Sequence, residues 1–294
     1  MALELPEWQV RSYAANVHHK AQEAQEKILG ACREESKTAE RIGFDVLAAM
    51  EGESPTTRLA PTPNHQADHS RRWVFPRPWV FAHQTDDIEK LKQLHDPNHE
   101  YTIAGARALN RERMRRFITA ARGSASEGEG TPTTVALPSA QKIAHGSARF
   151  TVDKAIEART KLDTATGGER DLYGDYYILY TADDLRTLLK DSKFTSRDYQ
   201  TDMALMTGKP PTGYLGFNWI QTSLLPTVSN VRYSVAWAKA AMGYGTNPAG
   251  HLEDVGPRLD LSMAEQVFLR EFFDFVRIED LLLIEIAIDT TAAV

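Results

Sequence analysis

The chain has 294 residues, a formal net charge of -6 and a single cysteine, Cys32. This length suits one large domain or two modest ones, and a hydrophobic content of 42% excludes disorder throughout. One cysteine excludes an internal disulfide framework and a cysteine-rich zinc site. The mild acidity argues against a protein that coats nucleic acid through its overall charge, while a local basic face stays open.

The N-terminus has neither the basic start nor the apolar run of a signal peptide. No stretch approaches the roughly 18 to 20 apolar residues that span a bilayer. The nearest candidate, 281–288, is short and is interrupted by Glu285. We therefore expect a protein that is made and kept in a cytosol-like compartment, without lipid.

The first segment in chain order, 8–36, is predicted to be a helix or an extended arm. It is polar and rich in Ala, Gln, Glu and Lys, which are good helix formers. Its apolar residues recur at steps of three and four and give only a thin stripe. Because such a stripe cannot make a core alone, we expect this segment to need a partner surface.

Residues 40–85 are predicted to form a long hairpin or extended loop. Apolar residues alternate over 44–50 as in a strand, and a long turn-prone tract follows at 51–65. A second extended run, 71–83, contains two prolines, which mark an edge strand or a strand outside a central sheet. A loop of this length in a compact domain is usually functional.

The same run carries an aromatic stripe. Trp73, Phe75, Trp79 and Phe81 have one parity and would share one face of a strand. Such a stripe is most often core, but a projecting hairpin has little core to enter, and an exposed aromatic stripe marks an interface. We predict an interface here, with a core position as the alternative.

Residues 101–122 give the clearest helix, which is predicted to end at Gly123. Its polar faces are strongly basic, with one acid, Glu112. The arginines are Arg107, Arg111, Arg113, Arg115, Arg116 and Arg122. Two hypotheses follow: a helix that contacts nucleic acid phosphates, or a solvated or intersubunit face paired to acids of other segments. The second is the more common arrangement, and the two do not exclude each other.

Beyond residue 150 the pattern is mixed. An amphipathic helix is predicted over 150–166 and a short buried strand over 176–180, after which Thr181 is a plausible helix N-cap. Further strands are predicted over 214–221 and 231–237. Two final segments, 263–275 and 276–288, are predicted to be the legs of a closing antiparallel pair. No repeat is visible at any fixed period.

No motif supports catalysis, a cofactor or a metal. His65 and His69 have a possible metal-binding spacing, but they lie in a Pro/Asn/Asp loop and lack the glutamate of a zinc protease motif. Cys32 and His145 have no activating surroundings in the sequence. The Gly-x-Gly tracts at 128–130 and 243–245 do not continue into a phosphate loop. We therefore predict no enzyme, no catalytic residue and no cofactor.

A resemblance becomes visible when the segments are taken in order. Residues 176–191 read Tyr-Tyr-Ile-Leu-Tyr-Thr-Ala-Asp-Asp-Leu-Arg-Thr-Leu-Leu-Lys-Asp, followed by Thr-Ser-Arg-Asp-Tyr at 195–199. Then come Gly-Tyr-Leu-Gly-Phe-Asn-Trp-Ile at 213–220 and Val-Ala-Trp-Ala-Lys-Ala-Ala-Met-Gly at 235–243. Arg-Arg-Trp-Val-Phe-Pro stands at 71–76. In this order the segments resemble the tailed-bacteriophage major capsid proteins of the Hong Kong 97 fold, over nearly the full length.

The resemblance implies an α+β fold of the Hong Kong 97 type with an N-terminal arm, an extended loop in the form of a long β-hairpin, a peripheral domain with a long spine helix, and an axial domain. The implied division has five parts. It runs 1–39 for the N-terminal arm, 40–85 for the extended loop hairpin, 86–149 for the peripheral domain with spine helix 101–122, 150–250 for the axial domain, and 251–294 for strands returning to the peripheral domain.

The resemblance also implies the surfaces and partners. The interface residues expected on the extended loop are Arg58, Arg71, Arg72, Trp73, Phe75 and Trp79. The basic helix face is expected at Arg107, Arg111, Arg115 and Arg116. The implied partners are further copies of the chain in pentamers and hexamers, scaffolding and portal proteins, and packaged double-stranded DNA contacted without sequence specificity, with no membrane. The protein would be assembled in the host cytoplasm and reside in the virion capsid.

Two other functions stay open as alternatives. One is the shell of a nanocompartment of the same fold that encloses protein cargo instead of DNA. The other is a soluble nucleic-acid-binding module that uses the arginine-rich helix. The content of purified particles distinguishes the first, and gel filtration the second, because a binding module would remain a small oligomer with a strongly salt-dependent affinity for DNA.

Overall fold

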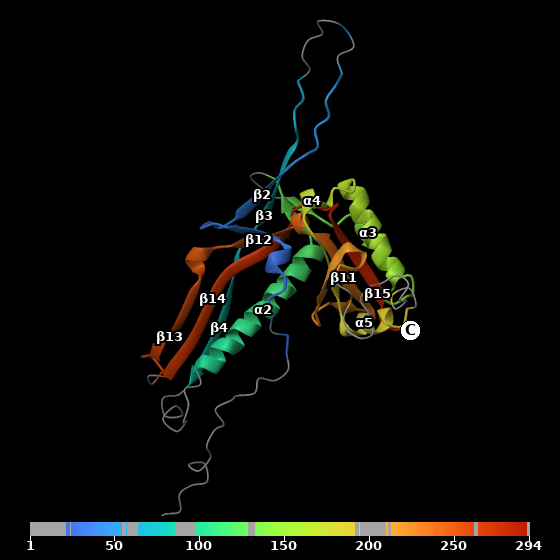
Figure 1. Cartoon of the computed structure of the whole chain (residues 1–294). Coiled ribbons are helices and arrows are strands. Elements are labelled where there is room, and N and C mark those ends of the chain that lie inside the picture. Colours follow the sequence, from blue (N-terminus) through green and yellow to red (C-terminus); the bar gives the residue numbers. More distant parts are fainter. Residues whose placement is uncertain are drawn as a thin grey trace, which may run out of the picture.

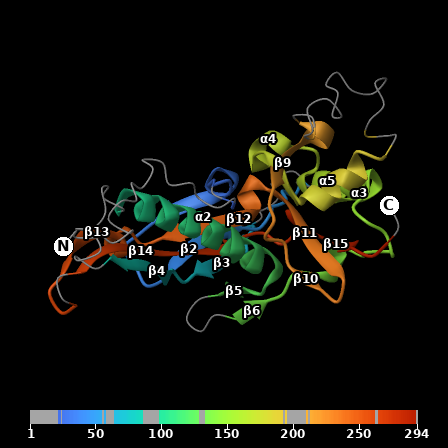
Figure 2. The ribbon, with the colours of Figure 1, turned by 90° about the horizontal axis from the view of Figure 1, so that it is seen from below.

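The structure is a computed structural model, and it describes residues 22–23, 25–54, 57, 64–85, 98–128, 133–191, 194, 210, 213–261 and 264–292. Three sheets and one long helix carry the architecture (Figure 1). Figure 2 shows the helix α2 running along one face of the five-stranded sheet, and the shorter helices α3, α4 and α5 gathered over the six-stranded sheet. The fold is therefore α+β, as predicted.

The first sheet has five strands in the order β1-β12-β14-β13, with β4 also paired to β14. Its strands are β1 (Arg33–Ser36), β4 (Arg77–Thr85), β12 (Met242–Thr246), β13 (Leu252–Arg258) and β14 (Ala264–Arg277). The long strand β14 is central, because it pairs antiparallel with β4, β12 and β13. The helix α2 (Asn98–Arg122) packs against β14, so this sheet and helix form one layered unit.

The second sheet has six strands in the order β7-β15-β11-β8-β9, with β10 also paired to β11. Its strands are β7 (Lys142–Ile143), β8 (Tyr176–Tyr180), β9 (Phe217–Gln221), β10 (Thr227–Val228), β11 (Val231–Ala238) and β15 (Leu283–Asp289). Its helices are α3 (Val152–Thr166), α4 (Arg170–Tyr173) and α5 (Ala182–Leu188). The sheet thus collects strands from four distant parts of the chain.

The third sheet contains the hairpin. Its order is β2-β3-β5-β6, with strands β2 (Ile42–Leu47), β3 (His69–Val74), β5 (Ala125–Glu127) and β6 (Thr133–Val135). Short 3-10 helices complete the described elements: η2 (Leu29–Ala31), η3 (Ser139–Gln141), η4 (Tyr214–Gly216), η5 (Lys239–Ala241) and η6 (Pro248–Gly250).

One hydrophobic core joins the two large sheets. Phe117 of α2 lies at the junction, with its ring centroid 4.7 Å from that of Trp237 on β11 and 5.7 Å from that of Phe275 on β14. The Trp237 indole also donates to the backbone oxygen of Ala31 over 2.9 Å, which ties the N-terminal segment to this junction. Burial of large rings is the main source of stability in such a core.

Most local predictions are confirmed. The predicted helix 101–122 is α2, the helix over 150–166 is α3, and the strands over 176–180 and 231–237 are β8 and β11. Thr181 caps α5 as expected, because its hydroxyl accepts from the Asp184 backbone N–H and the Asp184 carboxylate accepts in return from the Thr181 backbone. Over 214–221 only the second part, β9, is a strand.

Of the two alternatives predicted for 8–36, a helix or an extended arm, the helix is wrong where the structure describes this segment. Residues 22–23 and 25–36 contain η2 and the strand β1, which pairs in parallel with β12. Ile28, Ala31 and Cys32 are buried in the main core. The described end of this segment therefore has its partner surface within the same subunit. Residues 8–21 and 24 lie outside the described residues.

The predicted closing pair of 263–275 with 276–288 is also wrong. β14 and β15 belong to different sheets, since β14 pairs with β4, β12 and β13 while β15 pairs with β11 and β7. The physical reason is the turn at the fully buried Arg277, which donates to the Asp280 carboxylate and to the backbone oxygens of Ala121, Gly123 and Val135. These bonds hold the turn after which the chain leaves the five-stranded sheet and enters the six-stranded sheet.

Two of the ranges implied by the resemblance contain strands of more than one sheet. The final range, 251–294, supplies strands to both large sheets rather than to one. The range 40–85 includes β4, which runs along β14 in the five-stranded sheet, so the hairpin itself ends at β3. The proline-containing run does lie at the edge of that sheet, as expected from its prolines.

Candidate intersubunit interface

The hairpin of β2 and β3 is rooted firmly in the subunit. Its inward residues Ile42, Phe44 and Val74 form a small core with Val276 and Ile278. The root lies directly on β12 at Gly245, where a Cβ would stand only 2.2 Å from the Val74 Cγ1 atom. A larger residue there would push the hairpin off the sheet, so the direction of the hairpin is fixed by close packing.

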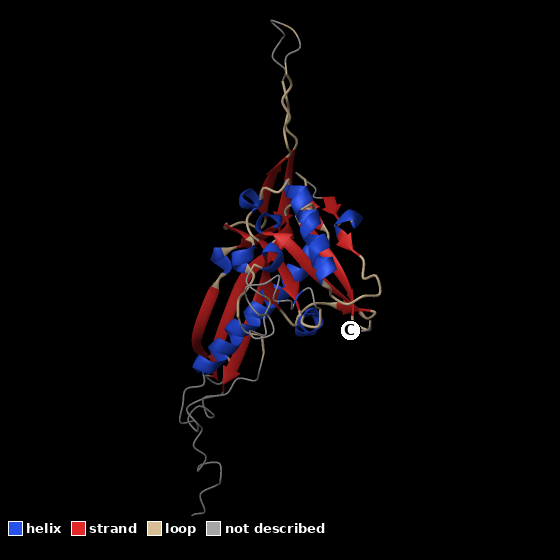
Figure 3. Cartoon of the chain, turned by 45° about the vertical axis from the view of Figure 1, so that its right-hand side comes forward, coloured by secondary structure: helices blue, strands red, loops and turns tan. Residues whose placement is uncertain are grey.

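Beyond this root the hairpin leaves the body of the molecule. The last backbone link between its two sides is the bond from the Ala48 N–H to the Asp68 oxygen, 2.9 Å. Figures 1 and 3 show the described residues that follow, 48–54 and 64–68, running outward side by side. Leu47 and Met50 expose 57% and 55% of their surface there. Exposure of large apolar side chains on a projecting element is typical of an interaction surface.

The arginines predicted on the extended loop have different positions. Arg71 is at the hairpin surface, paired with Asp45 on the opposite strand and placed 5.3 Å from the centre of the Trp73 ring. Arg72 instead points inward and is 6% exposed, with its Nη2 atom 3.0 Å from Asp280. The prediction of Arg72 as a surface residue is wrong, because alternate residues of β3 face opposite sides. Arg58 lies outside the described residues.

The predicted aromatic stripe is not one face. Trp73 donates to the Gly128 oxygen over 2.5 Å and belongs to the hairpin root, whereas Phe75 is 41% exposed. Trp79 belongs to β4 and packs against the main core, and Phe81 lies against Gly105 of α2. Phe75 and Pro76 stand between β3 and β4, outside either strand. The alternation of faces is therefore broken there, and residues of one parity do not share a face across the two strands.

Trp79 should therefore stabilise the subunit itself. We expect Trp79→Ala to lower the free energy of unfolding by about 2 kcal/mol, the value of burying a large apolar side chain. Phe75→Ala is the matched control and should change it by less than about 0.5 kcal/mol, as for an exposed position. Urea titrations of both variants measure the difference. Equal stabilities would show that Trp79 contributes nothing to the core.

Three of the six arginines of α2 are paired with the sheets of their own subunit. Arg113 makes two bonds to the Glu271 carboxylate of β14, at 2.7 and 2.8 Å, and Arg122 donates to Glu285 of β15 over 2.6 Å. Arg116 donates to Glu112 and to backbone oxygens of β4 and β14, and its guanidinium lies 4.4 Å from the centre of the Phe273 ring. The prediction that Arg116 belongs to an outward basic face is wrong.

Arg107, Arg111 and Arg115 remain, at intervals of four residues, the spacing that places side chains on one helix face. Arg115 is exposed, and Arg107 and Arg111 are half-buried. Arg115 is 57% exposed and only 3.8 Å from Glu112, a weak contact. Arg111 donates to the Gln22 side chain and to the Glu23 oxygen. Arg107 has no ion pair or hydrogen bond within the described residues. We call these three residues the arginine face.

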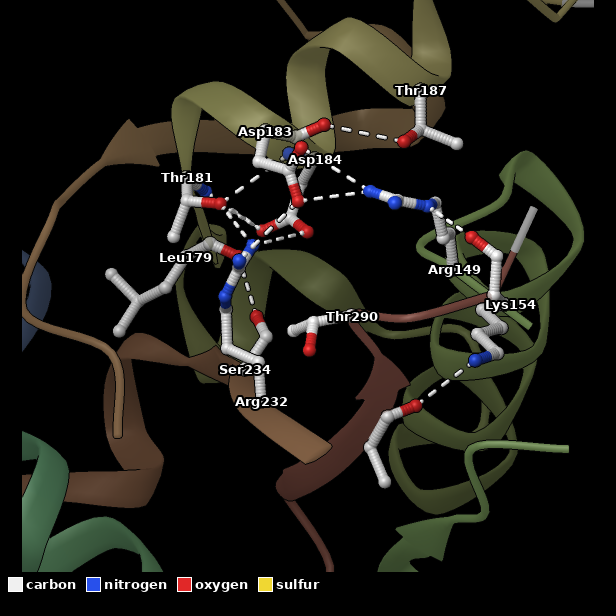
Figure 4. Close-up of polar contacts among 12 residues, drawn as sticks. Arg149, Lys154, Leu179, Thr181, Asp183, Asp184, Thr187, Arg232, Ser234 and Thr290 are labelled. Atoms are coloured by element: carbon white, nitrogen blue, oxygen red, sulfur yellow. Dashed lines mark hydrogen bonds and ion pairs between the residues drawn. The ribbon is translucent and has the colours of Figure 1, made fainter. Parts of the chain in front are cut away.

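A second polar cluster lies on the six-stranded sheet, and the sequence did not reveal it (Figure 4). Arg232 of β11 donates to Thr181 and Asp184 over 2.5 and 3.0 Å, and it lies 3.3 Å from Asp183. Arg149 donates to Asp183 and to the backbone oxygen of Ala292. In the sequence, Asp183 and Asp184 stand just after the predicted N-cap Thr181, where helix capping alone explains them, and Arg149 and Arg232 lie far from them.

This cluster has a structural role. Burial raises the pKa of Asp184, and the bonds from Thr181 and the charge of Arg232 oppose that shift. The nearby Lys154 ammonium donates to three backbone oxygens, those of His145, Ala148 and Ala287, over 2.8 to 3.0 Å. Together these contacts fasten the last described residues of the chain to α3, α5 and β11. The charges are satisfied by one another and by backbone oxygens.

Metal and membrane chemistry find no support in the described part of the chain. Its residues include no group of three or more His, Cys, Asp or Glu side chains placed to bind a metal ion. None of its helices combines the length and the apolar composition needed to cross a bilayer.

Comparisons with known proteins show the family and the fold of the chain. A family model described as phage capsid protein matches residues 5–289, and no curated protein sequence matches the chain. A solved chain from Mycobacterium phage Che8 is similar with a TM-score of 0.67 at 14% identity, covering 100% of both chains. One from the head of Helicobacter pylori bacteriophage KHP40 has a TM-score of 0.69 at 10% identity, covering 95% of this chain and 96% of that one.

A chain of the SrpI encapsulin complex from Synechococcus elongatus is also similar, with a TM-score of 0.63 at 8% identity, covering 98% of this chain and 96% of that one. At these identities the likenesses show a shared fold, the Hong Kong 97 type, across the whole chain. The capsid and encapsulin structures are therefore alike in fold, and the fold alone does not separate the two functions.

Proposed function

The chain belongs to the phage capsid protein family, and from this premise we propose that copies of it close into an icosahedral shell around double-stranded DNA, held together largely by the projecting hairpin. As a member of this family the chain is a structural subunit of the phage head, a component of the virion and not an enzyme. We further propose its assembly surfaces, its division into domains and its partners other than copies of itself.

The single observation that supports this proposal is the hairpin itself. It is rooted on β12 and then projects from the body, with Leu47 and Met50 exposed. If a subunit buries this hairpin only against a neighbour, each added copy lowers the free energy of the assembly. Repeated contacts between two different surfaces form closed shells when the rotation closes, and many weak contacts made together give a stable assembly.

The proposed division follows the sheets. The five-stranded sheet with α2 is the peripheral domain, and the six-stranded sheet with α3, α4 and α5 is the axial domain. Scaffolding and portal proteins are proposed as separate partners, and contact with DNA is proposed to be independent of sequence. Phe117 and the turn at Arg277 join the two domains, so we expect them to move little against each other within one subunit.

The contents of the particles test this proposal against a protein-filled compartment. We expect the protein, expressed with the packaging components of its phage, to appear as closed particles in negative-stain microscopy, and the particles to contain double-stranded DNA. The measurements are absorbance at 260 and 280 nm and nuclease-protected DNA. Particles that hold protein cargo instead of DNA would favour the encapsulin type of shell. A small oligomer with salt-dependent DNA affinity would favour a binding module.

A further inference from the structure

We propose that Asp280 couples the hairpin of β2 and β3 to the junction between the two large sheets. Asp280 lies in the turn 278–282, which leads from β14 into β15 and which we call the junction turn. Its carboxylate accepts from Arg72 on the hairpin and from Arg277 at the end of β14. The use of this coupling in a shell rests on the proposed assembly role of the hairpin, while the coupling itself rests on contacts within one subunit.

The two arginines bind different oxygens of Asp280. The Arg72 Nη2 atom donates to Oδ2 over 3.0 Å, and the Arg277 Nε atom donates to Oδ1. No other hydrogen bond reaches either oxygen within the described residues. The Asp280 side chain is 15% exposed, so an oxygen that loses its arginine has little water to replace the bond. Each arginine therefore holds the carboxylate in the orientation that the other one needs.

Arg72 depends on Asp280 for its charge partner. It is buried, and its Nε and Nη1 atoms have no hydrogen-bond partner. Glu127 of β5 is the other acid nearby, but its oxygen lies 3.6 Å from the Nη2 atom, beyond the distance of a good hydrogen bond. Because a buried guanidinium without a bonded carboxylate is strongly unfavourable, the hairpin root is tied by charge to the junction turn.

Arg277 connects Asp280 to the end of α2 and to β6. It is fully buried, and its other nitrogens donate to the backbone oxygens of Ala121, Gly123 and Val135 over 3.1, 2.7 and 2.8 Å. Without the carboxylate, this guanidinium would be an uncompensated buried charge. The bonds that hold the junction turn therefore depend on Asp280.

A displacement of the hairpin root is transmitted along these contacts. When β3 moves, Arg72 leaves the Oδ2 atom, the Asp280 carboxylate turns toward water, and Arg277 loses its acid. Coupling between two sites is reciprocal, so a loosened junction turn also frees the hairpin root. A neighbouring copy that holds the hairpin in place therefore stiffens the junction between the two large sheets.

Hydrogen exchange of the full-length subunit, measured before assembly, tests the coupling. Arg72→Met keeps the stem of the side chain and removes the donor to Asp280. We expect peptides that cover the hairpin root, 69–74, and the junction turn, 278–282, to exchange at least about fivefold faster than in the wild type. Arg71→Met is the matched control, since Arg71 is the neighbouring residue of β3 and is paired with Asp45 inside the hairpin. It should accelerate exchange in the hairpin only.

A double-mutant cycle separates this route from the packing of the hairpin root on Ile278. In an Asp280→Asn background the route is already cut, so adding Arg72→Met should change exchange in the junction turn by less than about twofold. A circular dichroism melt checks that each variant is folded. If a variant does not fold, Arg72→Gln replaces Arg72→Met, and the contrast with Arg71→Met decides without the cycle.

Two results would overturn the coupling. One is a junction turn that exchanges at the wild-type rate when Arg72 is replaced, and the other is an acceleration of equal size in both backgrounds. Because the exchange is measured on single subunits, neither result depends on whether the hairpin holds the shell together, which removal of its tip tests separately.

Discussion

Removing the tip of the hairpin, residues 54–68, is expected to give a folded subunit that no longer forms shells. The deletion joins Glu53 to His69 and leaves the pairing of β2 with β3 intact up to Leu47 opposite His69. The described residues that are lost are largely exposed and bury little within the subunit. The stability of the isolated subunit should therefore change by no more than about 0.5 kcal/mol, as for exposed positions.

Assembly should respond very differently. Each copy loses its projecting contact, and the loss is repeated around the shell, so we expect the yield of particles to fall by about a hundredfold or more. Sedimentation velocity separates shells from subunits, and a urea titration reports the stability of the subunit. An unfolded deletion variant would place the tip in the core. A folded variant that assembles normally would show that the shell is held by other surfaces.

Local structure was largely predictable from the sequence because it depends on near neighbours. The period of apolar residues predicted α2 and α3, and the capping residue Thr181 predicted the start of α5. The capping bonds join residues only three apart. The same is true of the hairpin, where a turn-prone tract stands between two strands that pair directly.

Long-range pairing was not predictable in this way. Both β14 and β15 have the apolar content of a buried strand, and nothing in the pattern assigns them to separate sheets. That choice depends on backbone oxygens of α2 and β6 that receive Arg277 across more than 140 positions of the chain. The prediction of one aromatic stripe was wrong for a related reason, since alternate residues share a face only within an unbroken strand.

The role of each arginine on α2 was equally hidden. Arg113 and Arg122 find their acids 158 and 163 positions away, in β14 and β15. A helical wheel groups Arg107, Arg111 and Arg115 on one side, but it cannot say which side meets the sheet. The structure separates two neighbouring arginines, Arg115 facing outward and Arg116 facing the sheet, and this separation leads to a sharp test.

Arg116→Glu is expected to destabilise the subunit by about 3 to 5 kcal/mol, the cost of breaking a buried charged contact. The Arg116 side chain is 12% exposed and donates to Glu112 and to the backbone oxygens of Arg77 and Phe273. A carboxylate in its place would meet those three oxygens with no hydrogen to donate. It would also lose the contact with the Phe273 ring. The variant should then unfold at markedly lower urea concentration than the wild type.

Arg115→Glu is the matched control, one residue away on the same helix and with the same change of charge. Its side chain is 57% exposed and has only the long contact with Glu112, so the free energy of unfolding should shift by less than about 1 kcal/mol. Parallel urea titrations of the two variants measure the contrast. Because both substitutions alter the net charge equally, a difference of several kcal/mol can come only from the surroundings of each side chain. Equal stabilities would mean that Arg116 is solvated like Arg115 and does not join α2 to β4 and β14.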